Sequence, residues 1–169
     1  WRAAYRAFGA KPQRTRNSLE ALLRRADSGL PRVNRLTDLY NAVSVRHQIP
    51  LGGEDLARYA GAPRLVRADG TETFVTTADG ASVVEHPEVG EVVWRDDAGV
   101  TCRRWNWRQA PRTGLTPQTT SALFVLDALE PAHRRRAGRR GGRARRAPGG
   151  AGPRRPAGPS AGPLTGRFG

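Results

Sequence analysis

The chain changes character at Pro131, and this change limits which part of it can fold. Residues 131–169 contain eleven Arg, ten Gly, seven Ala and six Pro, no acidic residue, and only Leu164 and Phe168 as large apolar residues. Such a segment cannot bury enough apolar surface to offset the entropy lost on ordering. We therefore expect one folded domain over residues 1–130 and a disordered Arg/Gly/Pro-rich tail over residues 131–169.

The tail also carries most of the net charge of +14. Residues 1–130 hold 18 Lys and Arg against all 15 Asp and Glu, a net charge of +3, and the tail adds +11. Two interpretations of the tail stay open: a genuine basic segment that follows a phosphate backbone, or the product of a shifted reading frame in GC-rich DNA. The chain starts at Trp1 and has no methionine, so we expect further residues before it.

Cys102 is the single cysteine, which rules out an internal disulfide. No Cys/His set has zinc-ligand spacing, because His47, His86 and His133 are scattered. No run approaches the roughly 20 apolar residues that span a membrane, and nothing resembles a secretory signal. We expect a cytoplasmic protein with no metal, no cofactor and no membrane partner.

Helical signals lie toward both ends of residues 1–130. Asn17, Ser18 and Glu20 predict a capped helix that ends near residue 28. A second helix is predicted after Thr37, and a third over residues 116–130, where Thr116 is a cap and Pro117 takes the first helical position. The buried stripe expected for the second helix is Leu36, Leu39, Tyr40 and Val43, and that expected for the third is Ala122, Leu123, Leu126 and Leu129.

The opposite side of the second helix carries Asp38, Asn41 and Ser44, which is either a solvated face or part of a site. Residues 50–53 are predicted to break that helix, and residues 54–59 to form a short helical turn. Strands are predicted over residues 64–67, 72–76, 91–95 and 100–107, with turns at residues 69–70, 79–80 and 96–99. The pattern predicts an α+β fold with a mixed, largely antiparallel sheet flanked by helices.

The stretch from residue 92 to residue 109 is the most unusual part of the domain. It reads VVWRDDAGVTCRRWNWRQ and holds three of the four tryptophans. If residues 100–107 form a strand, alternation places Cys102, Arg104 and Asn106 on one face. Such polar groups are tolerated in a buried sheet only when partners satisfy them, and a ligand can be that partner.

Four segments of the domain carry a family resemblance. They are residues 5–9, 30–56, 92–109 and 115–129, which read YRAFG, LPRVNRLTDLYNAVSVRHQIPLGGEDL, VVWRDDAGVTCRRWNWRQ and LTPQTTSALFVLDAL. With these segments, residues 5–130 resemble the B3/4 domain proteins, free-standing relatives of the tRNA-binding and editing module in the beta subunit of phenylalanyl-tRNA synthetase.

In the synthetase, that module hydrolyses the ester of tyrosine wrongly attached to its tRNA. Asp38 and Asn41 match the aspartate and asparagine of its Asp-Val-Thr-Asn helix. The module has a pocket histidine where this chain has Gly52, and His47 is interpreted as a surface residue. The resemblance implies a tRNA-binding protein, and the change at Gly52 leaves the editing activity open.

The first functional hypothesis is hydrolysis of misacylated tRNA at its aminoacylated 3′ end, with no DNA partner expected. Asn41, Arg104 and Asn106 are the candidate catalytic residues, as donors to a developing oxyanion. The second hypothesis is a non-catalytic module that holds tRNA or a free amino acid, and a third is nonspecific RNA binding through the tail alone. The candidate substrate-binding residues are Asp38, Ser44, Trp105, Arg108 and Gln109.

Structural interpretations stand beside these roles. Arg104 could instead form a salt bridge to Asp38, Asp96 or Asp97 that orders the sheet. Residues 96–97 are interpreted as part of a turn rather than a metal site, and Cys102 as a small buried thiol rather than a nucleophile. Packing in the core is the default interpretation for Trp94, Trp105 and Trp107, with stacking on bases as the alternative.

Overall fold

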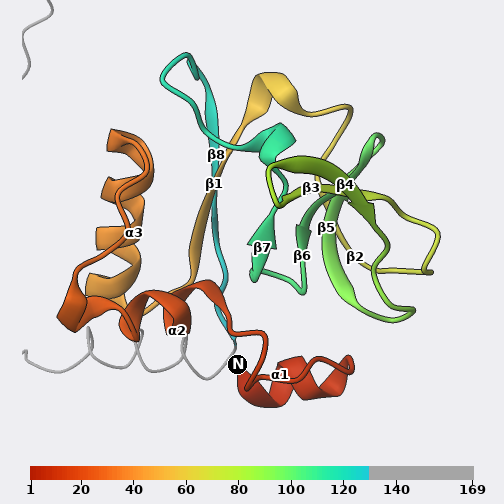
Figure 1. Cartoon of the computed structure of the whole chain (residues 1–169), viewed down its shortest axis with the longest axis horizontal. Coiled ribbons are helices and arrows are strands. Elements are labelled where there is room, and N and C mark those ends of the chain that lie inside the picture. Colours follow the sequence, from red (N-terminus) through yellow and green to blue (C-terminus); the bar gives the residue numbers. More distant parts are fainter. Residues whose placement is uncertain (130–169) are drawn as a thin grey trace, which may run out of the picture.

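The computed structural model describes residues 1–129, which form helices and strands in a mixed order (Figure 1). None of the helices in these residues is long and apolar enough to cross a membrane. The predicted disorder of the tail concerns residues outside this range. The helices are α1 (Arg2–Ala7), α2 (Ser18–Leu23) and α3 (Arg35–His47), with 3-10 turns at Ala26–Ser28, Leu56–Arg58 and Pro111–Thr113. The strands are β1 (Leu51–Asp55), β2 (Arg64–Arg67), β3 (Phe74–Ala78), β4 (Ala81–Glu85), β5 (Val92–Asp96), β6 (Gly99–Arg103), β7 (Arg108–Gln109) and β8 (Ala122–Leu126).

The described strands form three antiparallel sheets. β1 pairs with β8, β3 pairs with β4, and a four-stranded sheet has the order β2-β5-β6-β7. In Figure 1, α3 lies beside β1 and β8, while α1 and α2 run below the sheets. The predicted α+β class with largely antiparallel strands and flanking helices is confirmed.

The segment predicted as a third helix is a strand. Residues 122–126 read ALFVL and pair with β1 in the register Leu51 to Leu126 and Asp55 to Ala122. A short apolar run fits a buried helix and a strand equally well on spacing, and its Phe and Val favour the strand. The predicted end of the second helix before residues 50–53 is confirmed, because α3 ends at His47 and Gly52 and Gly53 lie inside β1. Of the helical turn predicted over residues 54–59, only Leu56–Arg58 forms.

The strand predicted over residues 100–107 ends early. β6 stops at Arg103, and the chain then turns with positive φ at Arg104 (47°) and Trp105 (67°) before β7 begins. The turn returns the backbone to β5, since the N–H of Trp105 donates to the carbonyl of Val92 at 2.6 Å. The faces assigned by alternation beyond residue 103 are therefore wrong.

The other strand predictions hold within about two residues. The strand at residues 64–67 is β2, and those at residues 72–76 and 91–95 correspond to β3 and β5. The turn at residues 79–80 connects β3 to β4, a strand that was not predicted. The turn at residues 96–99 is confirmed, with the N–H of Ala98 donating to the Asp96 carboxylate at 3.0 Å.

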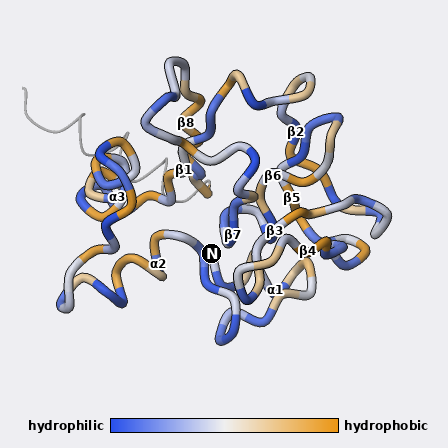
Figure 2. Tube along the Cα trace, turned by 45° about the horizontal axis from the view of Figure 1, so that its top comes forward, coloured by the Kyte–Doolittle hydropathy of each residue, from blue (hydrophilic) through white to orange (hydrophobic). Residues whose placement is uncertain are grey.

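The buried face of α3 is the polar one, contrary to the predicted apolar stripe. Thr37, Asn41 and Ser44 are its buried residues, whereas Leu39 is 60% exposed. The helix begins at an Asn34 cap, whose side chain accepts the N–H of Thr37, so Thr37 is not the cap. In α2 the predicted Asn17 cap is present, although the helix ends at Leu23, before residue 28. Hydrophobic and hydrophilic residues mix along α3 (Figure 2), and its apolar residues line a shallow surface groove instead of the core.

Two hydrophobic clusters hold the strands and the N-terminal helix together. One is centred on Phe74, Val93 and Val100 between β3, β5 and β6. The other joins Tyr5 and Phe8 of the N-terminal segment to Val92, with tryptophans of the 104–107 turn packed against it. This second cluster fixes the turn against the body of the protein.

Candidate functional site

A cavity of about 130 Å³ lies where α2 and α3 meet the β1–β8 sheet and the β6–β7 hairpin. Such a volume is below the roughly 300–1,000 Å³ of pockets for drug-sized ligands and suits a group of amino-acid size. Its polar lining is Ser18, Asn41, Glu54, Asn106, Gln109 and Asp127. The remaining lining is Tyr40, Leu51, Gly52, Trp94, Cys102, Trp105, Trp107 and Val125.

Two polar side chains of the wall have no partner in residues 1–129. The amide of Asn41 is buried on the inner face of α3 and makes no hydrogen bond there. The hydroxyl of Ser18, at the start of α2, is buried and equally unpaired. Buried polar groups in folded proteins are nearly always satisfied, so the Ser18 hydroxyl indicates a site that a ligand or water completes, and the Asn41 amide lines the same site.

Asp127 stands at the end of β8 within a chain of hydrogen bonds. Its Oδ1 accepts the indole N–H of Trp105 at 3.1 Å, and its Oδ2 accepts the Nδ2–H of Asn106 at 3.0 Å. Asn106 in turn accepts the hydroxyl of Tyr5 at 2.9 Å. Burial raises the pKa of Asp127 above its usual range, and the two hydrogen bonds only partly oppose this. This series of hydrogen bonds fixes the relative orientation of the Asp127, Asn106 and Trp105 side chains.

Glu54 and Cys102 line the same cavity. Glu54 is 7% exposed, and its carboxylate accepts the hydroxyl of Tyr59. Burial raises the pKa of Glu54, and it raises the pKa of the Cys102 thiol so far that the group stays protonated. The cavity therefore holds a thiol and not a thiolate nucleophile.

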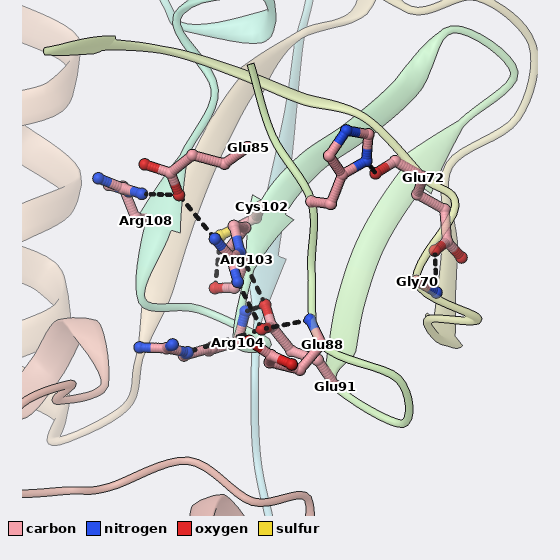
Figure 3. A network of polar contacts seen from close by, with 10 residues as sticks. Gly70, Glu72, Glu85, Glu88, Glu91, Cys102, Arg103, Arg104 and Arg108 are labelled. Carbon is pink, nitrogen blue, oxygen red and sulfur yellow. Dashed lines mark hydrogen bonds and ion pairs between the residues drawn. The ribbon is translucent and has the colours of Figure 1, made fainter. Parts of the chain in front are cut away.

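Arg103 and its partners form a buried ionic network beside the cavity (Figure 3). Its guanidinium donates to both oxygens of Glu91 at 2.9 and 2.7 Å and to Glu85 at 2.6 Å. Arg108 shares Glu85. Arg104 and Arg108 each place their guanidinium carbon 4.6 Å from the centroid of the Trp107 ring. These contacts hold the 104–108 segment in place.

A second cleft, of about 510 Å³, lies on the other side of the 104–107 turn. The N-terminal segment contributes Lys11 and Arg14, and the opposite wall contributes Glu88, Glu91 and Arg104. Because Glu91 is neutralised by Arg103, the cleft has an excess of positive charge.

The family model of the B3/4 domain matches residues 1–147. The chain belongs to the B3/4 domain family. A search of curated proteins finds no match. The B3/4 family is associated with binding of tRNA or other nucleic acid.

This B3/4 domain brings together only part of the predicted site. Asn41, Trp105, Asn106 and Gln109 share the cavity, and the Gln109 amide also donates to the carbonyl of Gly53 at 2.9 Å. Arg104 lines the second cleft, so the predicted convergence of Arg104 with Asn41 and Asn106 is wrong. The positive φ of Arg104 is the physical reason, because it ends the strand on which the prediction depended.

The other predicted residues of the B3/4 domain have structural contacts. The Asp38 carboxylate accepts hydrogen bonds from the Arg32 guanidinium at 2.6 Å and from the backbone N–H of Val33 at 2.9 Å, and it lies outside the cavity. The hydroxyl of Ser44 donates to the carbonyl of Ile49 at 2.6 Å and closes the end of α3. Arg108 is held by Glu85. The salt bridge considered for Arg104 exists, but its partner is Glu91 at 3.6 Å, since Asp38, Asp96 and Asp97 pair with Arg32, Arg112 and Arg64.

Sequence reasoning missed Asp127 and Ser18 as site residues of the B3/4 domain. Asp127 was hidden because residues 116–130 were assigned to a helix. On a strand, alternation from Val125 places Asp127 on the same face, and a carboxylate within the apolar run ALFVLDAL would have been the signal. In the described range, no group of three or more His, Cys, Asp or Glu could hold a metal ion.

Proposed function

We propose that this B3/4 domain binds the aminoacylated 3′ end of tRNA and hydrolyses the ester of wrongly attached amino acids, as the related module of phenylalanyl-tRNA synthetase does. The observation that carries the proposal is the buried, unpartnered hydroxyl of Ser18, which shares the wall of a cavity of amino-acid size with the Asn41 amide. The match of Asn41 to the module's asparagine supports it. The single cysteine supports a cytoplasmic location.

In the proposed reaction, water attacks the carbonyl carbon of the ester. The Asn41 amide donates to the oxygen on which negative charge develops, and Ser18 is placed to help. The bond between the carbonyl carbon and the ribose oxygen then breaks, and the ribose oxygen takes the proton that the water loses. The neighbouring hydroxyl of the terminal ribose assists this transfer, so no histidine is needed.

The second cleft is proposed to hold the RNA backbone that leads to the ester. Lys11, Arg14 and Arg104 line it, and such side chains contact phosphates without reading sequence. Arg104 lines the cleft, while Trp105, Asn106 and Trp107 line the cavity, and this proximity supports the proposal that the RNA backbone and the ester bind on neighbouring surfaces. In this scheme Arg104 is a tRNA-binding residue rather than a catalytic one.

A non-catalytic binding module is the second candidate. It is favoured by one observation: Gly52 stands in place of the module's histidine, and an added Cβ there would have no atom within 4 Å. The space is open and holds no acid–base group from that position. Under this hypothesis the cavity binds an aminoacyl group or a free amino acid and releases it unchanged.

Deacylation of a panel of correctly and wrongly charged tRNAs by the full chain separates the two candidates. We expect turnover of at least one wrongly charged tRNA, and a loss of about 10²–10³-fold in Asn41→Ala, the scale of deleting an oxyanion donor. Gln118→Ala removes an exposed amide outside the cavity and is the matched control. Binding of charged tRNA without turnover of any of them would establish the module instead.

A further inference from the structure

Asp127 is the only carboxylate of the cavity held by both an indole and an amide, and its partners carry no positive charge. In residues 1–129 no Lys, Arg or His lies within ion-pair distance of it, although most other partly buried carboxylates there have such a partner. Trp105 and Asn106 donate neutral hydrogen bonds. A carboxylate withdrawn from water favours a cationic partner, and the side of Asp127 that faces the cavity is where one can bind.

Aromatic rings add to this preference. Tyr40, Trp94 and Trp105 line the same cavity, and the faces of such rings attract ammonium groups. Trp107 also lines it, but two arginines already stack on its ring. A carboxylate surrounded by aromatic rings is a combination of groups suited to binding a small organic cation.

We propose that Asp127 binds the α-ammonium group of the aminoacyl moiety, so that the cavity accepts amino acids with a free, charged α-amine and rejects those whose amine is acylated. This inference rests on the proposed function for the identity of the ligand. The ammonium and the ester carbonyl are attached to the same carbon atom, and Asp127 and Asn41 line one cavity of about 130 Å³. One aminoacyl group can therefore contact both side chains.

Alternation in β8 explains why the carboxylate is available. Val125 and Asp127 lie on the face of the β1–β8 sheet that borders the cavity, and Gly52 pairs with Val125. Because Gly52 has no side chain, the space beside this position of β1 stays open toward the cavity. The Asp127 carboxylate is therefore accessible from the cavity, and in this proposal it is the group that binds the ligand.

The first test measures binding and needs no catalysis. L-Tyrosinamide has a free amine that carries a positive charge, whereas the amine of N-acetyl-L-tyrosinamide is acylated and neutral. Isothermal titration calorimetry on the full chain compares their affinities at about pH 6.5, where the free amine is largely protonated. We expect the charged probe to bind about 10–100-fold more tightly, the range of a hydrogen bond to a charged group. Equal affinity for the two probes overturns the proposal, and this comparison on the unaltered chain needs no variant.

Asp127→Asn then assigns the preference to this residue. The variant keeps the shape of the side chain and one acceptor oxygen for the two donors, Trp105 and Asn106, and we expect it to lose the preference while it still binds the acetylated probe. Asp79→Asn makes the same charge change in an exposed turn, at a positive φ of 51° that asparagine tolerates, and is expected to bind like the unaltered chain. A preference that survives in a folded Asp127→Asn variant overturns the assignment.

Aminoacyl-tRNA and N-acetylaminoacyl-tRNA substrates separate this inference from the proposed function. Hydrolysis of the free-amine form alone supports both. Equal hydrolysis of both forms overturns the role of Asp127 and leaves the deacylase standing. If neither form is hydrolysed, the deacylase fails, and the calorimetric comparison alone decides whether Asp127 binds an ammonium group.

Discussion

Gly52 and Gly53 are neighbours in β1 with opposite surroundings. A Cβ on Gly52 would meet no atom within 4 Å, because the position faces the cavity. A Cβ on Gly53 would lie 2.7 Å from Leu115 Cδ1 and 3.0 Å from Tyr40 Cε1. The two faces of one strand thus differ: the face at Gly52 leaves open space in the cavity, and the face at Gly53 allows close packing.

Substitution of the two glycines by alanine should therefore give different stabilities. Gly53→Ala is expected to lower the free energy of unfolding by about 1–3 kcal/mol through overpacking. Gly52→Ala is expected to change it by no more than about 0.5 kcal/mol, or to increase it slightly, since alanine costs less backbone entropy. Chemical denaturation of the two variants makes the comparison, and equal losses would show that the space beside Gly52 is not open.

The ion pair of Asp96 with Arg112 should contribute to stability in acid. Burial alone would raise the pKa of Asp96, but Arg112 and the N–H groups of Ala60 and Ala98 outweigh burial and hold the pKa below its usual range. The unfolded chain therefore binds the proton more readily, so the contribution is complete above the usual pKa of about 3.9 and is lost as the pH falls through the lowered pKa.

Replacement of Arg112 tests this contribution. Arg112→Gln should lower the free energy of unfolding by about 3 kcal/mol near neutral pH, because it leaves a fully buried carboxylate without its cation. The dependence of stability on pH between about 2 and 5 should flatten in the same variant. Arg64→Gln breaks the exposed pair with Asp97 and should cost less than about 1 kcal/mol. Similar losses in both variants would contradict the assignment.

Asp127 should have the opposite effect on stability. Burial raises its pKa, so the folded state binds the proton more readily than the unfolded state does. The contribution of Asp127 to the free energy of unfolding falls as the pH rises from the usual aspartate pKa of about 3.9 through the raised pKa. Without ligand, Asp127→Asn should gain stability relative to the unaltered chain over that interval. Denaturation curves at several pH values measure the difference, and a difference that does not vary with pH would exclude the effect.

Charge removal in the second cleft should weaken tRNA binding in a way that depends on salt. The double variant Lys11→Ala, Arg14→Ala is expected to lower affinity for all tRNAs and to reduce the slope of log K against log salt by about 1 for each lost phosphate contact. The double variant Arg25→Ala, Arg46→Ala removes the same charge from exposed positions outside the cleft. If both pairs have the same effect, the cleft has no special role.

Local signals in the sequence were sufficient for several elements. β2 and the Asn17 cap of α2 were predicted because alternation and capping act over a few neighbouring residues. The apolar run of β8 was assigned to a helix because its pairing with β1 involves residues distant in the sequence. The predicted site omitted Asp127 for the same reason, since only that pairing determines which face of the sheet Asp127 lies on.

The polar face of α3 is a second feature that the sequence alone did not predict. Asn41 and Ser44 were recognised as a stripe, but a stripe of three polar residues does not reveal which side is buried. The turn at Arg104 and Trp105 is a third, since neither residue type favours positive φ and tertiary packing of the tryptophans imposes it. Asn41, Trp105, Asn106 and Gln109 were among the predicted residues and line one cavity, whereas the separate place of Arg104 could not be predicted.

The pairing of Leu51 with Leu126 affects the order in which the protein acquires its site during translation. The ribosome has synthesised α3, β1 and the four-stranded sheet before it reaches the strand that carries Asp127. Until then the edge of β1 is unpaired, and exposed edges are prone to pair with other chains. The cavity is complete only after residue 127 leaves the exit tunnel, so a nascent chain interrupted earlier would have the folded sheet without the wall formed by Val125 and Asp127.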